Sequence, residues 1–356
     1  VHGHGEYSGE SQVKNNDKTP TINDVARAAG VSKRTVSRVI NKSEKVNEKT
    51  RSRVEEIIRK LDFAPNRQAR GLAASRSYLL GLIYDVPTLF INDIQKGMLT
   101  VCEDSGYEVV VHACHIENDN LIDDVTRFIN RANLDGVLVL PPVSDIEALA
   151  DKLDEMGTRF VRFSSRLGNK PWKQVVTDYM PAIMDMTGHL VGLGHTDFGF
   201  ITGPPTHVSS QKRHEVFKQV LKTHGLTLSR SLTVEGAFTY ESGVEAAKKL
   251  LSRKKRPTAI FAANDEMAFG VMNVADSMGI KIPRDLSLVG FDGTPFSTFV
   301  IPSLSTIIRQ TDQMARLGTQ KLLALINDGP DAARTFETMV SPRFVPREST
   351  GPVPAQ

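Results

Sequence analysis

Basic and hydroxyl side chains are grouped between Ser32 and Asn41, at a spacing that fits one face of a helix. At 3.6 residues per turn, Val36, Val39 and Ile40 lie on the opposite face, which would be buried. Guanidinium, ammonium, hydroxyl and amide groups are the donors that contact phosphates and base edges in the DNA major groove. The residues on this polar face are Lys33, Arg34, Ser37, Arg38 and Asn41. The alternative to a DNA-binding role is a basic amphipathic helix on a solvated surface.

A second set of polar side chains lies further along, where Arg213, Asn264 and Asp292 each follow an expected strand or begin an expected helix. Together they supply a fork of N–H donors, an amide and a carboxylate. Such a set suits a polyhydroxylated ligand. For any one of the three, a capping or surface role is the alternative, so their convergence at one place is what favours a binding site.

The elements that must position the first set are two short helices joined by a turn, at residues 21–41. Thr21 can cap the first helix, with Asp24 as its partner three residues on. Gly30 suits the left-handed end of that helix, and Ser32 is a good N-cap for the next one. A third helix is expected after Asn47. This pattern predicts a helix-turn-helix whose second helix could lie in the major groove.

From Tyr78 onward, short apolar runs alternate with amphipathic stretches. The runs include LLGLIYDV, YEVVVHAC, GVLVLPP, FGFITG, AIFAAN and LSLVGFD. This order predicts parallel sheets with helices on both faces, in two subdomains that face a cleft. Because ligands of open α/β sheets bind beyond the carboxyl ends of the strands, the cleft is the expected ligand site.

Charge is distributed unevenly along the 356 residues, whose net charge is +3. Residues 20–76 hold 14 Lys and Arg against 6 Asp and Glu, a local charge of +8, whereas residues 77–356 carry −4. A small basic module on a slightly acidic body is typical of a nucleic-acid-binding protein. No apolar run has the length of a membrane span, and no signal peptide is recognisable. Cys102 and Cys114 make no disulfide framework, so we expect a cytoplasmic protein.

The sequence TINDVARAAGVSKRTVSRVIN at residues 21–41 resembles, almost residue for residue, the headpiece of the lactose-repressor (LacI/GalR) family of bacterial transcription regulators. The body resembles the periplasmic-binding-protein-like sensor domain of that family as far as about Thr350, through VTDY, HLVGLGH, NDEMAFG and LSLVGFD. The resemblance implies an all-α helix-turn-helix headpiece and a hinge helix, joined to an α/β body of two doubly wound parallel-sheet subdomains.

The expected organisation has five parts. They are a disordered polar arm at 1–19, a DNA-binding domain at 20–64, a hinge at 65–77, an effector-binding and dimerisation domain at 78–350, and a tail at 351–356. By the resemblance, the chain crosses between the subdomains near Thr177, near Leu304 and at residues 335–338. The first subdomain would then comprise about 78–176 and 306–335, and the second about 177–304 and 336–350. In the arm, His2 and His4 could bind a metal weakly, but a flexible leader is the favoured interpretation.

The resemblance also implies DNA contacts. In the family, the segment that matches residues 65–77 folds on DNA and enters the minor groove, where a leucine opens a base step. Leu72 is the matching position here, and a plain linker is the alternative for this segment alone. The candidate DNA contacts are Thr21, Ser32, Lys33, Arg34, Thr35, Ser37, Arg38 and Asn41, with Asn66, Arg70, Leu72 and Ala73 in the hinge.

The family residues that match Arg213, Asn264 and Asp292 bind the effector. Phe238 falls where family members place an aromatic ring that stacks on a sugar or a base. With the remaining matches and weaker candidates, the expected effector contacts are Asp85, Phe90, Asp178, Ser209, Arg213, Phe238, Asn264 and Asp292. The sequence departs from the family pattern at Gly293, where an aspartate is common, and at Tyr179, where asparagine is usual. Residues 304–310 carry one residue more than the usual form, so no contact is assigned to Gln310.

These features predict a repressor whose homodimer binds a pseudo-palindromic operator under the control of a small effector. A mono- or disaccharide is the favoured effector, and a purine is the main competitor. The final residues PRESTGPVPAQ contain no leucine heptad, so a dimer is expected rather than a tetramer. A solute-binding protein of a sugar transporter is the alternative, but it has no use for the headpiece. We find no nucleophile, general base or phosphate loop that would indicate an enzyme, and we expect no catalytic residue, cofactor, metal or membrane partner.

Overall fold

The structure of the protein is a computed structural model that describes residues 20–40, 43, 45–63 and 76–354. The chain divides after Ser77 into two compact units. We call the described part of the first unit the headpiece and the second unit, from Tyr78, the body, and we describe each by itself. The arm at residues 1–19 and five candidate DNA contacts lie outside the described residues, namely Asn41, Asn66, Arg70, Leu72 and Ala73.

The described part of the headpiece contains three helices, α1 (Ile22–Ala29), α2 (Lys33–Ile40) and α3 (Glu48–Lys60). Their apolar faces meet in one core, whose buried members are Val25, Ala26, Ala29, Val36, Val39, Val54 and Phe63. Helices this short are marginal in isolation. The shared core is therefore what stabilises them.

The turn between α1 and α2 forms as the sequence predicts. The Asp24 carboxylate accepts hydrogen bonds from the backbone N–H and the hydroxyl of Thr21, at 2.9 and 2.7 Å. Gly30 closes α1 in the left-handed conformation, with φ of 63°. The Ser32 hydroxyl accepts a hydrogen bond from the Thr35 N–H at 3.1 Å and so caps α2. These local interactions fix the direction of α2 relative to α1.

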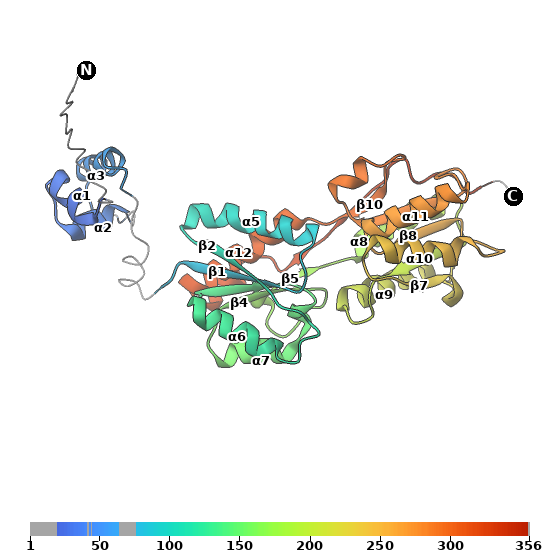
Figure 1. Ribbon diagram of the computed structural model, residues 1–356, viewed down its shortest axis with the longest axis horizontal. Coiled ribbons are helices and arrows are strands. Elements are labelled where there is room, and N and C mark those ends of the chain that lie inside the picture. The colour runs from blue at the N-terminus through green and yellow to red at the C-terminus, as the bar shows by residue number, and fades with distance from the viewer. Residues whose placement is uncertain (1–19, 41–42, 44, 64–75, 355–356) are drawn as a thin grey trace, which may run out of the picture. The chain divides into compact units, whose positions relative to one another are not determined.

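The first subdomain of the body is a six-stranded sheet in the order β11-β5-β4-β3-β1-β2, with every neighbouring pair parallel. Helices α5 and α12 pack together on one face, and α6 and α7 cover the other (Figure 1). Its elements are β1 (Leu79–Tyr84), α5 (Leu89–Ser105), β2 (Glu108–Ala113), α6 (Leu121–Ala132), β3 (Gly136–Val139), η1 (Val143–Asp145), α7 (Glu147–Glu155), β4 (Phe160–Ser164), η2 (Pro171–Lys173), β5 (Gln174–Thr177), α12 (Thr311–Asn327), α13 (Pro330–Arg334) and β11 (Met339–Val340).

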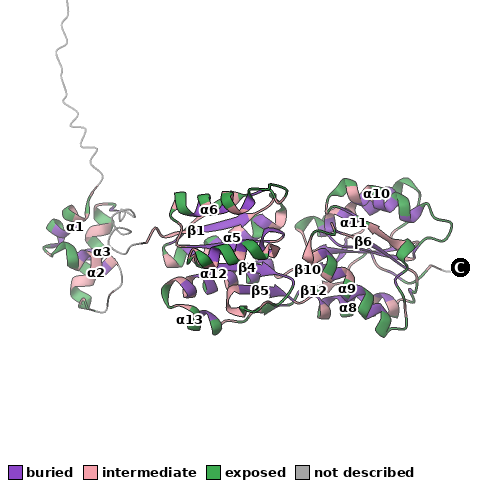
Figure 2. Ribbon diagram, turned by 90° about the horizontal axis from the view of Figure 1, so that it is seen from below, coloured by how far each residue is buried: buried purple, intermediate pink, exposed green. Residues whose placement is uncertain are grey.

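The second subdomain repeats this plan with the strand order β12-β10-β9-β8-β6-β7, in which β12 alone is antiparallel to its neighbour among the described strands. Helices α8 and α9 lie on one side of the sheet and α10 and α11 on the other (Figure 2). Its elements are α8 (Met180–Gly192), β6 (Phe198–Thr202), α9 (Val208–Thr223), η3 (Arg230–Leu232), β7 (Thr233–Glu235), α10 (Tyr240–Leu251), β8 (Ala259–Ala262), α11 (Asp265–Ser277), β9 (Ser287–Asp292), η4 (Pro295–Thr298), β10 (Ser305–Ile308) and β12 (Arg343–Val345).

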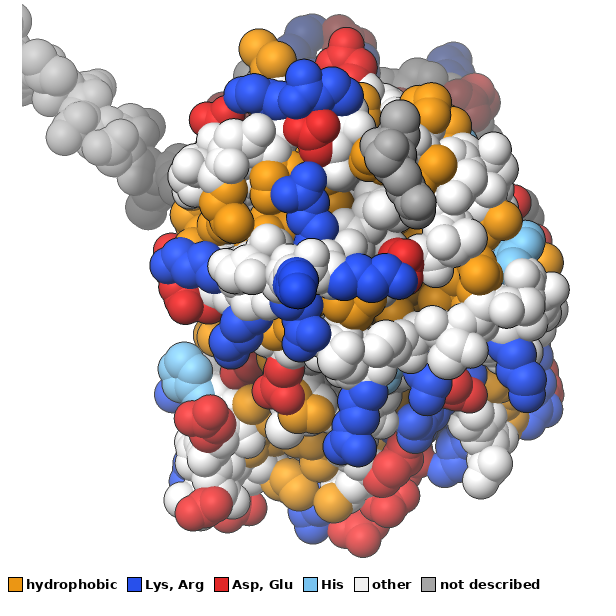
Figure 3. All heavy atoms as spheres, turned by 90° about the vertical axis from the view of Figure 1, so that its right-hand side faces the viewer, with side chains coloured by type: hydrophobic (Ala, Val, Ile, Leu, Met, Phe, Trp, Pro, Cys, Tyr) orange, Lys and Arg blue, Asp and Glu red, His pale blue; other side chains and the backbone are white. Residues whose placement is uncertain are grey.

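The fold class is confirmed for the described headpiece and body, because strands and helices alternate into two doubly wound parallel sheets. Buried apolar residues form a core on the strands of each sheet and on the helices that cover it, and Figure 2 shows the buried parts of these elements in purple. On the end face of the second subdomain, Lys and Arg side chains lie among Asp and Glu side chains (Figure 3). Among the residues that the structure describes, no helix is long and apolar enough to cross a membrane.

Two of the three expected crossings between the subdomains are misplaced by a few residues. The first follows β5, as expected near Thr177. The second was expected near Leu304, but β10 pairs with β9 in the second sheet, so the chain crosses only after Ile308. The third was expected at residues 335–338, but β11 pairs with β5 in the first sheet, so the chain crosses between Val340 and Arg343. Both errors have one cause, since a short edge strand is assigned by a distant partner and not by its own sequence.

Candidate functional site

The polar face of α2 carries the residues expected to contact DNA. Lys33 and Arg34 are exposed, and Ser37 and Arg38 are half-buried, while Val36 is fully buried on the opposite face. The hydroxyls of Ser32 and Thr35 lie 2.9 Å apart at the start of the helix, and Thr21 is exposed at the start of α1. α2 therefore presents basic and hydroxyl side chains on the face away from the headpiece core.

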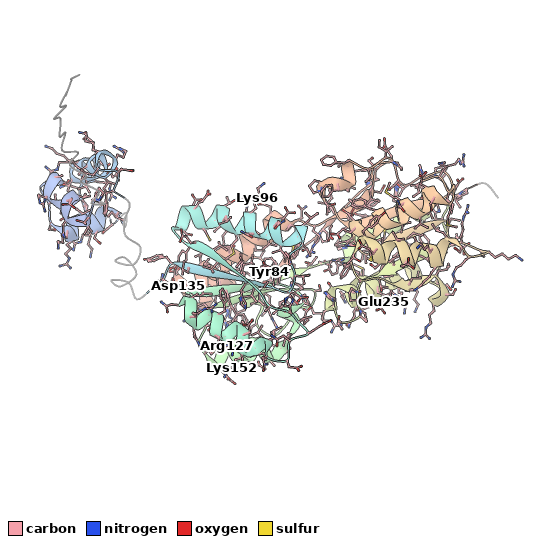
Figure 4. All side chains as sticks on the ribbon, in the orientation of Figure 1. Tyr84, Lys96, Arg127, Asp135, Lys152 and Glu235 are labelled. Atoms are coloured by element: carbon pink, nitrogen blue, oxygen red, sulfur yellow. The ribbon has the colours of Figure 1, made fainter. Side chains whose placement is uncertain are left out.

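The ends of the strands nearer the neighbouring subdomain carry the candidate effector residues. In the first subdomain, Tyr84 ends β1 on that side, whereas the exposed side chains Lys96, Arg127 and Lys152 point outward from α5, α6 and α7 (Figure 4). In the same subdomain, Phe90 near the start of α5 is half-buried, and the guanidinium carbon of Arg309 lies 3.7 Å from the centre of its ring.

Arg213 on α9 is buried, with an exposed fraction of 3%. Its guanidinium carbon lies 3.7 Å from the ring centre of Phe291, 5.3 Å from that of Tyr179 and 5.8 Å from that of Phe238. One terminal nitrogen donates a hydrogen bond to the carbonyl of Ala263, while Nε has no hydrogen-bond partner. Stacking on aromatic faces holds the guanidinium plane and leaves an edge free to donate.

Asp292 ends β9 and faces Arg309, which follows β10. The Arg309 Nη1 and Asp292 Oδ1 atoms are 3.6 Å apart, an ion pair longer than a hydrogen bond. Burial raises the pKa of the Asp292 carboxyl, and Arg309 and Arg213 oppose that change. Burial also lowers the pKa of Arg309, and the Asp292 carboxylate opposes that change. Asp292 thus shares its surroundings with two guanidinium groups.

Two candidate residues have an unusual backbone. Asp292 has a φ of 112° and Phe238 a φ of 62°, both in the region that favours glycine. Such conformations cost free energy and persist only where the surrounding structure enforces them, which is common at binding sites. The Phe238 ring packs against Gly203. A Cβ atom at position 203 would lie 2.0 Å from the ring, so only a glycine leaves room for it.

Both side-chain hydrogen bonds of Asn264 are made to backbone groups of the protein, one of them to Phe238. Its Oδ1 accepts a hydrogen bond from the Met267 N–H at 3.0 Å and so caps α11. Its Nδ2 donates to the carbonyl of Phe238 at 2.8 Å. One amide N–H and one lone pair are left for other partners.

The remaining candidates are engaged in local structure. Asp85 accepts a hydrogen bond from the Ile116 N–H at 3.0 Å. Asp178 accepts one from the Met180 N–H at 3.0 Å, at the first crossing between the subdomains. Ser209 is half-buried one turn before Arg213 on α9. Direct contacts join Phe90, Arg309 and Asp292, and others join Arg213 to Tyr179 and Phe238. Because the charge of Arg213 also acts on the Asp292 carboxyl, these residues form one cluster.

Two residues of this cluster, Arg309 and Tyr179, were not predicted. The extra residue noted in 304–310 was a signal that this stretch is unusual, but it did not indicate which side chain enters the site. The pairing of β10 with β9 shows that this side chain is Arg309, because Ile308 lies opposite Asp292 and the next residue, Arg309, therefore lies beside Asp292. The same pairing explains Gly293, where a Cβ atom would lie 2.6 Å from the Ile308 side chain. Tyr179 is buried and its hydroxyl lies 2.9 Å from that of Ser165 in the other subdomain.

Comparisons with known proteins cover both units. Residues 21–66 match the family model for bacterial regulatory proteins of the lacI family, and residues 187–350 match the model for a periplasmic binding protein-like domain. Catabolite control protein A of Priestia megaterium is 31% identical over 309 residues, which cover 86% of this chain and 92% of that protein. The probable HTH-type transcriptional repressor ExuR of Bacillus subtilis (strain 168) is 30% identical, over 92% of this chain and 98% of that protein.

This chain belongs to the lacI family.

A solved structure of the lac repressor dimer bound to operator and the anti-inducer ONPF has a similar fold. It superposes with a TM-score of 0.77 at 26% identity, over 94% of this lacI-family chain and 100% of that one. These relatives are transcription regulators rather than enzymes or transport proteins. The lacI-family chain is therefore a DNA-binding transcription regulator, and the alternative of a transporter's solute-binding protein is set aside.

Proposed function

We propose that the protein is a repressor that binds a pseudo-palindromic operator as a homodimer, and that a small polar effector bound between the subdomains of the body controls its operator affinity. The observation that carries this proposal is the cluster of Arg213, Arg309 and Asp292, whose atoms include buried donors and an acceptor without hydrogen-bond partners. Buried polar atoms without partners are costly. A ligand that supplies the missing partners would offset that cost.

The proposed DNA contacts are those of the predicted set. Lys33, Arg34, Ser37 and Arg38 on α2 would face base edges and phosphates. Leu72, which lies outside the described residues, would open the central base step. The lac repressor dimer solved on its operator supports two headpieces for one operator. A repressor of this kind acts where the chromosome is, so the proposal includes a cytoplasmic location.

The proposed effector contacts are Arg213, Arg309, Asp292 and Phe238, with Asn264 holding Phe238 in place. A second solved relative, the regulator CelR, is described in complex with cellobiose, and it superposes with a TM-score of 0.67 at 27% identity. This favours a sugar-like effector over a purine. Asp85, Asp178 and Ser209 stay as proposed peripheral contacts. Either sign of control, release of the operator or tighter binding, is compatible with the site.

The proposal is tested by titrating operator DNA with the full-length protein, with and without sugars and nucleosides. Arg213→Ala should abolish the change in operator affinity that a ligand causes, while binding of operator without ligand stays as in the wild type. Lys212→Ala is the matched control, because Lys212 is the neighbouring cation on α9 and pairs with Glu215. An Arg213→Ala protein that folds and responds to ligand like the wild type contradicts the proposal.

A further inference from the structure

The charges at the junction of the two subdomains do not balance. Arg213 and Arg309 each stack on an aromatic ring, with the guanidinium carbon 3.7 Å from the ring centre of Phe291 and of Phe90 respectively. Asp292 is the carboxylate paired with Arg309. Arg213 has no carboxylate oxygen within ion-pair distance among the residues that the structure describes. Arg213, which is buried, and Arg309, whose side chain is 11% exposed, therefore share one paired carboxylate, that of Asp292.

Of the other acidic groups nearby, Asp265, Asp85 and Asp178 accept hydrogen bonds from other parts of the protein. The oxygens of Asp265, an acidic side chain close enough for the charge of Asp292 to act on it, accept hydrogen bonds from the Thr306 hydroxyl at 2.6 Å and the Thr294 N–H at 2.7 Å. Asp85 accepts a hydrogen bond from the Ile116 N–H in the loop after β2, and Asp178 accepts one from the Met180 N–H two residues on. Glu266 is half-buried on α11, and burial, followed by the charges of Asp292 and Glu241, raises the pKa of its carboxyl. His207 stands against the Phe238 ring, and burial lowers its pKa.

The unpaired atoms of the site are mainly donors. The Nε atoms of both Arg213 and Arg309 are buried without a hydrogen-bond partner. One terminal nitrogen of Arg213 donates a hydrogen bond to the carbonyl of Ala263. A neutral carbonyl or a ring face orients a guanidinium group without neutralising its charge. Burying a cation without a counter-ion is costly, and a guanidinium fork matches the geometry of a carboxylate or a phosphate.

We propose that the effector is an acidic sugar, a polyhydroxylated anion whose carboxylate or phosphate lies between Arg213 and Arg309. This inference rests on the effector role proposed above and narrows its ligand class. The anion supplies the missing counter-charge and accepts from the unpaired guanidinium edges. Asp292 accepts a ligand hydroxyl, and the Phe238 ring covers the apolar face of the sugar. Neutral sugars and neutral purines would leave the excess positive charge buried.

The test is a comparison of matched acidic and neutral ligands with the full-length protein. Glucuronate, galacturonate and gluconate provide the carboxylates, glucose 6-phosphate provides the phosphate, and glucose and galactose are the neutral parents. We expect at least one acid to raise the melting temperature and to change operator affinity, at a concentration where its neutral parent does neither. The class that binds, carboxylate or phosphate, identifies the anion.

Two single variants distinguish binding of the acid by Arg309 from a general effect of losing one positive charge. Arg309→Gln should reduce affinity for the acid by about tenfold or more, because it removes a charge-assisted, forked contact. Arg316→Gln is the matched control, since the Arg316 side chain on the following helix is 42% exposed and pairs with Asp312. If Arg309→Gln fails to fold because Asp292 is left unpaired, the double variant Asp292→Asn/Arg309→Gln removes both charges and should lose acid binding likewise.

The outcomes distinguish the acidic-sugar inference from the proposed function as an effector-controlled repressor. A neutral sugar that binds as tightly as its acid and changes operator affinity overturns the acidic-sugar inference and leaves the effector role standing. Binding of acids by the double variant with wild-type affinity also overturns it. A protein that binds operator but shows no melting shift and no change in operator affinity with any acid of the panel refutes the inference as well. A protein that does not bind operator DNA refutes the proposed function itself.

Discussion

Asp265 gives the body a pH dependence whose sign can be worked out. It is the first residue of α11, is fully buried, and lies beneath Gly290, where a Cβ atom would come within 2.4 Å of its Oδ1. Burial is the main cause that raises its pKa from 3.8 to about 7, and the charge of Asp292 adds to it. The folded protein therefore holds this proton more tightly than the unfolded chain does.

The magnitude follows from that difference in proton affinity. A folded pKa above the unfolded one means that the stabilising contribution is full below about pH 4 and is lost as the pH rises to about 7. At about 1.4 kcal/mol for each tenfold change in proton affinity, the whole loss is about 4 kcal/mol, of which about 2.5 kcal/mol falls between pH 5 and pH 8. Asp265→Asn removes the titration and keeps an oxygen that can accept from Thr294.

The assay is urea unfolding of the wild type and the variant, followed by circular dichroism at about pH 5 and pH 8. The variant should gain stability relative to the wild type by about 2.5 kcal/mol between these two pH values. Asp276→Asn is the matched control, because Asp276 lies on the same helix with its side chain 83% exposed. A stability difference for Asp265→Asn that does not change with pH would show that the carboxyl is not held protonated by burial.

Other predictions concern the headpiece, the hinge and the assembly. Arg38→Ala should weaken specific operator binding by about 1–3 kcal/mol, whereas Arg27→Ala on α1 should not, and an equal loss on unrelated DNA would exclude a base contact. Val36→Ala removes a fully buried side chain and should destabilise the headpiece by about 2 kcal/mol in thermal unfolding; an unchanged transition would contradict its place in the core. Leu72→Ala should reduce operator bending in a gel-mobility assay while ligand affinity stays the same, and wild-type bending would rule out the wedge. Sedimentation at micromolar concentration should give the mass of two chains, and a mass of four would refute the dimer.

The headpiece was predictable because its signals are local. Thr21 with Asp24, Gly30, and Ser32 with Thr35 each act within three residues of one another, so the sequence alone contains both partners of every cap. The apolar positions of the second helix recur at helical spacing, and two of the three residues that this spacing selects, Val36 and Val39, are buried. Local propensity and packing favour the same helices in the headpiece, so the predicted caps Thr21, Gly30 and Ser32 lie at the observed ends of α1 and α2.

The body was predictable in kind but not in detail. Alternating strands and helices imply a doubly wound sheet, yet the order of strands within it depends on partners far away in the chain. β10 and β11 show this most clearly. Each is a short strand whose sheet is decided by the neighbour it pairs with, β9 for one and β5 for the other. The two misplaced crossings are the direct result.

The effector site lies between these cases. Arg213, Asp292 and Phe238 could be named because each matches a position of a known family motif. Arg309 could not, since its place beside Asp292 depends on the pairing of Ile308 with Asp292 and on the stacking of its guanidinium group over Phe90. The positive φ angles of Asp292 and Phe238 could not be predicted from the sequence either, because a positive φ is expected mainly at glycine and neither residue is a glycine.

The position of Arg309 has a mechanical consequence. It follows a strand of the second subdomain, pairs with Asp292 of that subdomain and stacks on Phe90 of the first. The crossing segment that carries it leads directly into α12, which packs against α5 and the first sheet. A ligand can shift a conformational equilibrium only through contacts that differ between the two states. A ligand group bound by Arg309 would act on a side chain that already touches both subdomains, so its binding energy would depend on how the subdomains are disposed.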